Sequence, residues 1–530
     1  MATRSPTKIR KGAGSGAAGL SAHTILETLG QRPEFALGII DDLIGLGGMA
    51  QLDEDMIAVH ILMLGTVLEP IRRGVEAGQH AAITLADDVR LLLVDAEAAG
   101  RIEPGLMMLI LNQFVAANLD VGEKLQAIML RMIEDRARDA TPDDLRDGQE
   151  ELRQLAGELG GNPFEIHAHL SETAEALPPP SQAKLALSLL AEADDGLTNA
   201  ALGFLLNPAA EVRAAVARRL CEDADCTAAD SKAASELLRR ISALCNWLPT
   251  SERPVLDAAI KGMRQKGVTS ASWSKPAKLE AYASGFDGSG MQGVFLIAKE
   301  GRKHSIAALI GRLGMGVRDA WVRHGASKRE VEALLRSGNQ MGGMAPVSID
   351  YVALAVRHFL AGNAQFGSMP PFGLLAFAEC AGLAGLEPEA TGVEALVARL
   401  CNMIEPAYLP PATIDRMLAA SADWPDAHAL LQSWFEGGDD ATKLLAGKRP
   451  GKATKLAAIL AGPVNEHRRQ WAEKLAWMAL FTKAITDADT PWREFAIVAR
   501  ELLTDRPIGE IGLMHRIAEQ TLEAIDDGRP

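Results

Sequence analysis

Residues Gly196–Asp223 read GLTNAALGFLLNPAAEVRAAVARRLCED, and this stretch has the most specific pattern in a chain of 530 residues. A first helix is predicted to end near Leu206, because proline disfavours helical geometry in the residue that precedes it. Asn207 and Pro208 then turn the chain, and the proline suits the first turn of a second helix, which begins at Ala209. The inner face of this second helix is predicted to consist of Val212, Ala215, Val216 and Leu220. The stretch therefore predicts two short helices joined by a tight turn.

This helix pair resembles a HEAT-type repeat. In such a repeat, a turn that contains proline leads into a second helix with a Val-Arg pair, here Val212-Arg213, followed by small apolar residues. The resemblance covers about one unit. The neighbouring segments 232–247 and 254–266 have suitable lengths for helices but lack the signature, and no strict period of roughly 40–47 residues can be traced. The resemblance implies an α-solenoid, and a helix-loop-helix inside an irregular bundle is the alternative.

The composition favours helices over the rest of the chain. The sequence is 48% hydrophobic but only 5% aromatic, and Ala and Leu carry most of the apolar share. Unbranched side chains lose little rotamer freedom in a helix, whereas sheets favour the β-branched and aromatic residues that are scarce here. A chain of this length exceeds the size at which a single core stops growing. We therefore predict a mainly α protein, organised as an irregular α-solenoid or helical-repeat array.

One segment departs from the helical pattern. Two apolar runs, Val294–Ala298 and Ser305–Leu313, are separated by a polar segment that contains Gly301. Because glycine permits a sharp turn, we predict one small β-hairpin insert at this place. A helix over Ile306–Leu313 is the alternative.

Helix signals lie on both sides of this segment. Between residues 57 and 71, apolar residues step by four or three positions and so share one helical face: Ile57, Ile61, Leu64, Leu68 and Ile71. Ser327 and Glu330 form a capping box for a short helix that is expected to end near Gly338. Trp471 begins another helical stripe, with Lys474 along its edge, and is predicted to belong to the core rather than to stack on bases.

Composition and punctuation divide the chain into five expected parts. Residues 1–20 carry four basic residues and no acid, and we predict a disordered basic tail, with an organelle transit peptide as the alternative. Three prolines at 178–180 stop any helix and separate an acidic N-terminal helical domain (21–177) from HEAT-like helical pairs (181–268). A mixed segment with the hairpin (269–346) and a C-terminal helical-repeat region (347–530) complete the chain.

The motifs of common enzymes and cofactor sites are incomplete. Ala446–Lys452 reads AGKRPGK, but Ala453 stands where a phosphate-binding loop needs Ser or Thr. Gly288, Gly290 and Gly293 form a GxGxxG string ahead of the predicted strand rather than after one, so a loop that leads into the hairpin is expected. No Cys or His spacing fits a metal site. Neither a cofactor nor a metal is expected.

The small number of cysteines and the lack of long apolar stretches predict the compartment. Five cysteines are too few and too scattered for a disulfide framework. No stretch reaches the roughly 18 uninterrupted apolar residues that a membrane span needs. A cytoplasmic protein without a membrane span is therefore expected.

Charge is distributed unevenly and provides the only functional lead. The formal charge of the chain is −15, but residues 21–200 alone carry −19, with 31 Asp and Glu against 12 Lys and Arg, while residues 201–530 hold 38 of each. Two basic islands, at 291–330 and 441–474, interrupt the balanced half. The candidate anion, nucleic-acid or docking residues are Arg302, Lys303, Arg318, Arg323, Lys448, Arg449, Lys452, Arg468 and Arg469.

Three functions follow from this layout. The first is a non-catalytic scaffold that offers a helical surface to a protein partner. The second is a nucleic-acid-associated protein whose basic islands grip the phosphate backbone; the same islands would alternatively dock on the acidic region of this chain or of a second copy. The third is an enzyme whose site the sequence does not reveal.

Overall fold

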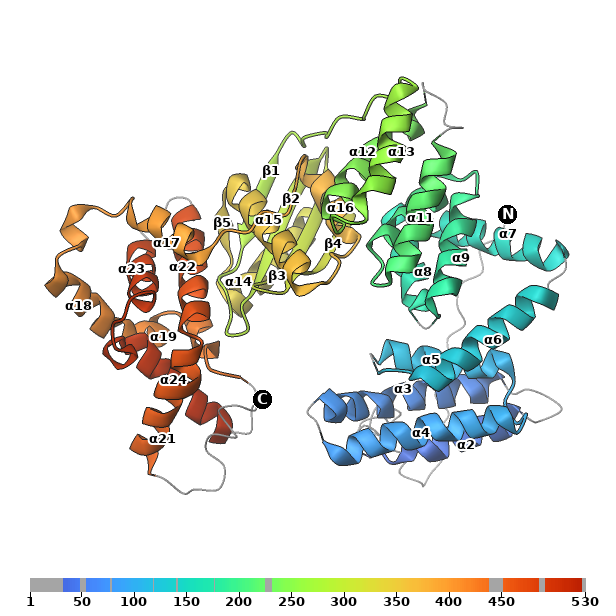
Figure 1. Cartoon of the computed structure of the whole chain (residues 1–530), viewed down its shortest axis with the longest axis horizontal. Helices are drawn as coiled ribbons and strands as arrows, with labels where there is room; N and C mark the ends of the chain where they lie inside the picture. Colours follow the sequence, from blue (N-terminus) through green and yellow to red (C-terminus); the bar gives the residue numbers. More distant parts are fainter. Residues whose placement is uncertain are drawn as a thin grey trace, which may run out of the picture. The chain divides into compact units, whose positions relative to one another are not determined.

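The computed structural model describes residues 32–47, 54–76, 79–117, 119–139, 142–175, 177–224, 231–437, 451–485 and 491–526. Over these ranges the chain is mainly helical, as predicted, and contains one antiparallel sheet (Figure 1). It divides into two compact units. Unit 1 comprises Met1–Thr141 and Leu170–Pro178, and unit 2 comprises Pro142–His169 and Pro179–Pro530. The expected basic tail at 1–20 lies outside the described residues.

The described part of unit 1 is a bundle of helices around a core of aliphatic side chains. On α3, the predicted inner face is buried, because Leu64, Leu68 and Ile71 are fully enclosed. The helices are α2 (Phe35–Gly47), α3 (Glu54–Glu76), α4 (His80–Ala98), α5 (Pro104–Ala116) and α6 (Glu123–Asp139).

The helix pair predicted at Gly196–Asp223 is confirmed. The first helix continues as a 3-10 turn up to Leu206, and the second begins at Ala210 after the Asn207-Pro208 turn. Between residues 142 and 268 the elements are α7 (Pro142–Glu158), α8 (Pro163–Ala174), α9 (Pro179–Leu190), α10 (Asp195–Ala201), η1 (Leu202–Leu206), α11 (Ala210–Asp223), α12 (Lys232–Trp247) and α13 (Arg253–Gln265).

The Val-Arg pair at the start of α11 closes this turn. Val212 is buried in the core, while the guanidinium of Arg213 donates to the carbonyls of Asn207 and Pro208 at 2.6 and 2.7 Å. The same guanidinium forms an ion pair with Glu252, just before α13, at 2.6 Å. Arg213 therefore ties the turn to the following helix pair. After α13 the chain enters the sheet, and the described elements do not form the predicted solenoid.

The predicted hairpin is confirmed, but it belongs to a larger sheet. Five strands lie in the order β4-β3-β2-β1-β5, and every neighbouring pair is antiparallel. The helix considered for Ile306–Leu313 is wrong, because Ile306 lies in a strand that pairs on both sides. The strands are β1 (Leu279–Ala283), β2 (Met291–Glu300), β3 (Lys303–Arg312), β4 (Gly316–Ala326) and β5 (Ala345–Val347).

Helix α15 (Ile349–Phe366) covers one face of the sheet, together with α16 (Gly373–Ala381) (Figure 1). A β-carbon at Gly311 would overlap the ring of Phe359, and one at Gly316 would overlap Asn363. The Asn363 amide bonds both the N–H and the carbonyl of Val317, at 2.8 and 3.2 Å. Because these glycines lack a β-carbon, the helix packs directly against the backbone of the strands.

The opposite face of the sheet is covered at one end by α14 (Lys328–Gly342). Ile297 and Ile306 of the sheet pack there against Val331 of the helix. The predicted capping box is confirmed: the Ser327 N–H donates to the Glu330 carboxylate at 2.7 Å, and the Glu330 N–H donates to the Ser327 hydroxyl at 3.3 Å. The register between β3 and β4 shifts twice, at His304/Ile306 and at Ile310/Gly311.

The C-terminal helices pack on one another and on the loop that precedes β2. Trp471 is buried, as predicted, and the indole N–H of Trp434 donates to the Phe286 carbonyl at 2.9 Å. The elements are α17 (Val393–Cys401), η2 (Pro406–Tyr408), α18 (Pro411–Ala420), η3 (Ser421–Asp423), α19 (Trp424–Ala427), η4 (Ala429–Ser433), α21 (Lys452–Ile459), η5 (Leu460–Val464), α22 (Arg468–Ala484), α23 (Trp492–Leu502), η6 (Ile508–Glu510) and α24 (Gly512–Asp526).

A histidine on α8 fills the space beside η1. The ring of His167 contacts the rings of Phe204 and Phe372, and its Nδ1 lies 3.1 Å from the Ala200 carbonyl. Burial lowers the pKa of His167 to about 4, although the Ala200 carbonyl favours the charged form. A β-carbon at Gly203 would overlap the imidazole. Glycine is therefore required at this position of the quoted stretch.

Replacing Gly203 with Ala should destabilise unit 2 by about 1–3 kcal/mol, because the new methyl group displaces a packed ring. Urea unfolding followed by circular dichroism measures the change. Gly157 of α7 is a matched control, since it is exposed and a β-carbon there meets nothing within 4 Å. Gly157→Ala should be neutral or stabilising by up to about 1 kcal/mol. Equal stability of the two variants would contradict the packing at Gly203.

Acidification should weaken the fold through His167. In the unfolded chain this imidazole titrates near 6.5, so between about pH 6.5 and pH 4 the unfolded state holds more protons than the folded one. The free energy of unfolding therefore falls as the pH drops through this window, by about 3 kcal/mol in all. Urea midpoints measured from pH 7 to 4 should show this loss in the native sequence and a smaller loss in His167→Gln.

Candidate functional site

The face of the sheet opposite α15 is only partly covered by the described elements. Strand alternation assigns side chains to faces. Gln292 hydrogen-bonds Tyr351 of α15 at 2.7 Å and therefore points to the covered side, so Phe295 and Ile297, at odd positions of β2, point to the other side. Ile297 lies under α14 there. Phe295 belongs to the part beyond α14, which we call the open face.

A row of aromatic side chains crosses the open face. In the register of the sheet, Tyr282 of β1 pairs with Phe295, Phe295 pairs with Ala308 of β3, and Ala308 pairs with Trp321 of β4. Tyr282 packs against the hydrophobic cluster under α14, Phe295 is partly buried, and Trp321 is 41% exposed. Directly paired side chains of an antiparallel sheet stand about 5 Å apart, so the row is a continuous aromatic and apolar strip over four strands.

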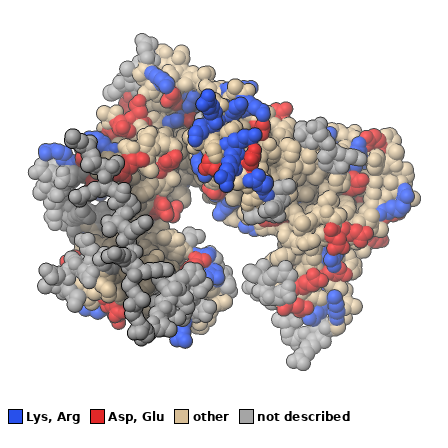
Figure 2. Space-filling view, turned by 180° about the vertical axis from the view of Figure 1, so that it is seen from behind, with Lys and Arg blue, Asp and Glu red and all other residues tan. Residues whose placement is uncertain are grey.

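Cations of the first basic island lie around this strip. Lys and Arg side chains gather over the part of unit 2 that holds the sheet (Figure 2). Arg323 lies two residues from Trp321 on the same strand face and pairs with Glu330 at 3.8 Å. Arg318 is exposed on β4 and Arg312 ends β3, so both lie toward the other end of the sheet. Arg323 is therefore the guanidinium group that the register places beside Trp321 on the open face, and Arg318 lies at the register shift farther along β4.

Two predicted members of this island lie elsewhere. Arg302 and Lys303 are exposed in the β2–β3 turn, which is beyond α14 when seen from the aromatic row. Lys303 acts electrostatically on Glu330, at the start of that helix. The sequence therefore grouped residues that the sheet places at opposite ends.

The second predicted island is not one cationic surface in the described part of the chain. Lys448 and Arg449 lie outside the described residues, and Lys452 is exposed in the first turn of α21. Arg468 donates to the carbonyls of Leu502, Thr504 and Arg506, and Arg469 is paired with Glu394. The guanidinium of Arg468 thus completes the end of α23, and Arg469 is largely neutralised.

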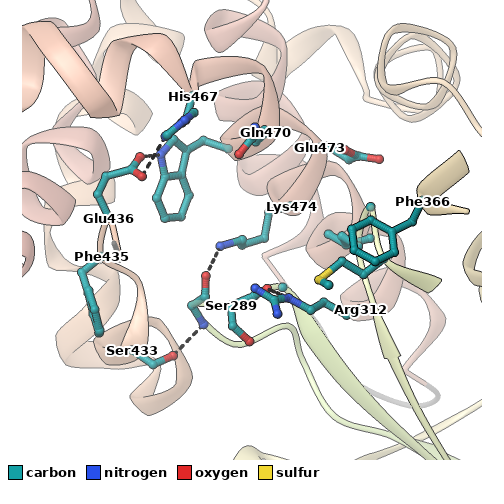
Figure 3. A pocket seen from close by; sticks show the side chains of 17 residues that line it. Ser289, Arg312, Phe366, Ser433, Phe435, Glu436, His467, Gln470, Glu473 and Lys474 are labelled. Carbon is teal, nitrogen blue, oxygen red and sulfur yellow. Dashed lines mark hydrogen bonds and ion pairs between the residues drawn. The ribbon is translucent and has the colours of Figure 1, made fainter. Parts of the chain in front are cut away.

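A pocket of about 800 Å³ lies where the loops of the sheet meet α22 (Figure 3). Its wall includes the turn Gly288–Gly290, the β3–β4 turn and the aromatic side chains Phe366, Phe435 and Trp471. The first two glycines of the GxGxxG string supply this turn. The strand begins earlier than predicted, at Met291, so Gly293 lies within β2. A β-carbon at Gly288 would overlap the backbone of Ser433, so the turn packs directly on the C-terminal helices.

A lysine is buried in this pocket. Lys474 is 9% exposed, and its ammonium lies 4.1 Å from the ring centroid of Trp471 and 5.1 Å from that of Trp434. It donates one hydrogen bond to the carbonyl of Gly288. Burial lowers the pKa of Lys474 to about 8, with Arg312 lowering it further and Glu436 and Asp287 opposing the shift.

The acidic side chains of the pocket are bonded to other groups. Glu436 accepts from the Trp471 indole at 2.6 Å and lies 2.9 Å from Nδ1 of His467 (Figure 3). Glu473 lies 3.5 Å from His358. The helical stripe predicted from the sequence places Lys474 at the edge of a helix, next to the core residue Trp471. The position of Lys474 in a pocket depends instead on loops that are far away in the sequence.

Within the described residues, no group of three or more His, Cys, Asp and Glu is placed to hold a metal ion. No described helix is long and apolar enough to cross a membrane.

Comparisons with known proteins relate the chain to Y4lR. Residues 178–267, which include the quoted helix pair, match the Y4lR second domain, and residues 394–526 match the Y4lR C-terminal helical domain. The chain is 24% identical over 472 residues to the uncharacterized protein y4lR of Sinorhizobium fredii, a match that spans 87% of this chain and 88% of that protein. No solved structure matches. The chain is therefore a distant relative of y4lR that shares the second and C-terminal helical domains of Y4lR proteins.

Proposed function

We propose that this protein binds single-stranded nucleic acid on the open face of its sheet. The observation that supports the proposal is the aromatic strip Tyr282–Phe295–Trp321, with Arg323 beside Trp321 on the same face. Contact between an exposed tryptophan ring and water is unfavourable. A flat ligand that covers the ring removes this apolar surface from water, which favours binding. Bases are flat, and every base has a face that can stack.

The arginines suit the other half of such a ligand. A single strand carries one phosphate per nucleotide, and guanidinium groups bind phosphate oxygens through paired hydrogen bonds. Arg323 lies about 7 Å along β4 from Trp321, two residues at strand spacing, so one nucleotide would reach both. Stacking on Trp321 and phosphate contact with Arg323 would thus come from one strand.

The geometry favours a single strand over a duplex. Stacking on the strip requires bases that are turned out of a helix, as in single-stranded loops and ends. The acidic excess lies in residues 21–200, so that part of the chain repels phosphate and would not compete with this face.

A protein-interaction scaffold is the second candidate, and a separate observation favours it. On α3, Met56, Val59 and Leu62 are exposed at spacings of three residues, and Leu62 is 60% exposed. Such a stripe on a described helix surface is typical of a contact with a protein partner. The HEAT-like helix pair supports the same candidate, since its resemblance implies a repeat surface.

Binding to a labelled mixed-sequence 12-nucleotide RNA, measured by fluorescence anisotropy, tests the proposal. Affinity should fall with salt, with a logarithmic slope of roughly −1, because one or two arginines of β4 replace counterions. Trp321→Ala should weaken binding about tenfold, since a stacked base contributes roughly 1–3 kcal/mol, and Trp321→Phe should retain most of it. Arg323→Ala should weaken binding and reduce the slope.

Arg469→Ala is the matched control, because Arg469 is a paired arginine of the other predicted island. It should bind like the native protein, and a duplex of the same sequence should bind more weakly than the single strand. Absence of binding at low salt, or an unchanged affinity in Trp321→Ala, would overturn the proposal.

The scaffold candidate has its own test. A partner recovered from nuclease-treated native lysate should be lost when Val59 and Leu62 are both replaced by Ser, and retained in Val255→Ser, which changes an exposed valine on α13. Recovery of the native chain alone would count against this candidate.

A further inference from the structure

The pocket beside α22 holds two cations that have no ionic partner among the described residues. Lys474 donates to the carbonyl of Gly288, and Nε of Arg312 donates to the next carbonyl, that of Ser289, at 2.9 Å. One turn therefore fixes both positive groups, and each acts on the other, since Arg312 lowers the pKa of Lys474. Arg312 thus opposes the charge of Lys474, while Glu436 and Asp287 favour it.

The nearby carboxylates do not bridge these cations. Glu436 is bonded to Trp471 and His467, and Glu473 lies against His358. Asp287 accepts from the Ser289 hydroxyl and from the Met291 N–H, both at 2.8 Å. Each acid thus has partners of its own, and the two cations keep donors available: an ammonium has three N–H groups and a guanidinium five.

We propose that this pocket binds a small organic oxyanion, with a phosphate or carboxylate group between Lys474 and Arg312 and a planar ring against the aromatic wall. Figure 3 shows the two side chains reaching the same turn from different elements, Lys474 from α22 and Arg312 from the end of β3. An oxyanion there accepts charge-assisted hydrogen bonds from both. The volume of about 800 Å³ has room for a ring beside the anionic group.

The aromatic wall specifies the rest of the ligand. Phe366 and Phe435 line the pocket together with Trp471, and Phe366 is 55% exposed in the structure. A ring that covers Phe366 removes apolar surface from water. An anion without a ring would contact only the cations, and a neutral ring would contact only the aromatic wall. A molecule that has both parts should therefore bind best. This inference does not depend on nucleic-acid binding by the open face.

Isothermal titration calorimetry with four probes tests the proposal: phenyl phosphate, benzoate, inorganic phosphate and benzyl alcohol. Phenyl phosphate or benzoate should bind at least tenfold more tightly than inorganic phosphate, and benzyl alcohol should not bind measurably. The stronger of the two aromatic anions identifies the anionic group. Arg312→Gln, which keeps a polar side chain at the edge of the pocket, should weaken that probe at least tenfold. Trp321→Ala on the open face should leave its affinity unchanged.

A second measurement reads Lys474 directly. After reductive ¹³C-methylation of the lysines, the Lys474 signal should titrate near pH 8 in the free protein and at higher pH with the aromatic anion bound. Arg312, Asp287 and Glu436 face Lys474 in the free protein and in the complex alike, so a difference between the two titrations reports the bound anion. The signal of Lys452, which is exposed, should be the same with and without the probe. Lys474→Met, checked for folding by circular dichroism, identifies the signal.

The proposal is overturned if neither aromatic anion binds, if Arg312→Gln binds as well as the native protein, or if bound probe leaves the Lys474 titration unchanged. Equal affinities for benzyl alcohol and phenyl phosphate would show a merely apolar hollow and would also overturn it.

Discussion

The close contact of α15 with β3 and β4 is the constraint on which the arrangement of unit 2 depends. Gly311 and Gly316 have no β-carbon, so Phe359 and Asn363 lie directly against the strands, and Asn363 bonds both backbone groups of Val317. One face of the sheet is thereby sealed. The aromatic strip consequently falls on the other face, and the same helix ends at Phe366, on the wall of the pocket.

Features that depend on neighbours in sequence could be predicted, and features that depend on distant pairing could not. The Asn207-Pro208 turn, the capping box at Ser327 and the hairpin around Gly301 each arise within a few residues, and each is present. Strands β1, β4 and β5 were missed. β4 reads GVRDAWVRHGA, which lacks a clean apolar alternation, and its place in the sheet comes from pairing with β3.

The candidate sites show the same limit. A count of basic residues along the chain identified Arg318 and Arg323, but it grouped them with Arg302, which the sheet places beyond α14. It also selected Arg468, whose charge is used on the carbonyls after α23. The pocket combines residues near 288, 312, 435 and 470, and no local pattern brings those together. The sheet itself lies between the two segments that match Y4lR domains, while the pocket joins it to the second of them.

The edges of the sheet differ from its open face in what they offer another chain. β5 is extended by a bridge from Val347 to Ile485, and β4 carries two register shifts together with exposed Arg318, Asp319 and Arg323. Irregular, charged edges resist the addition of a further strand. The proposed ligand would therefore bind the aromatic side chains on the face of the sheet, while the edges resist aggregation with another sheet.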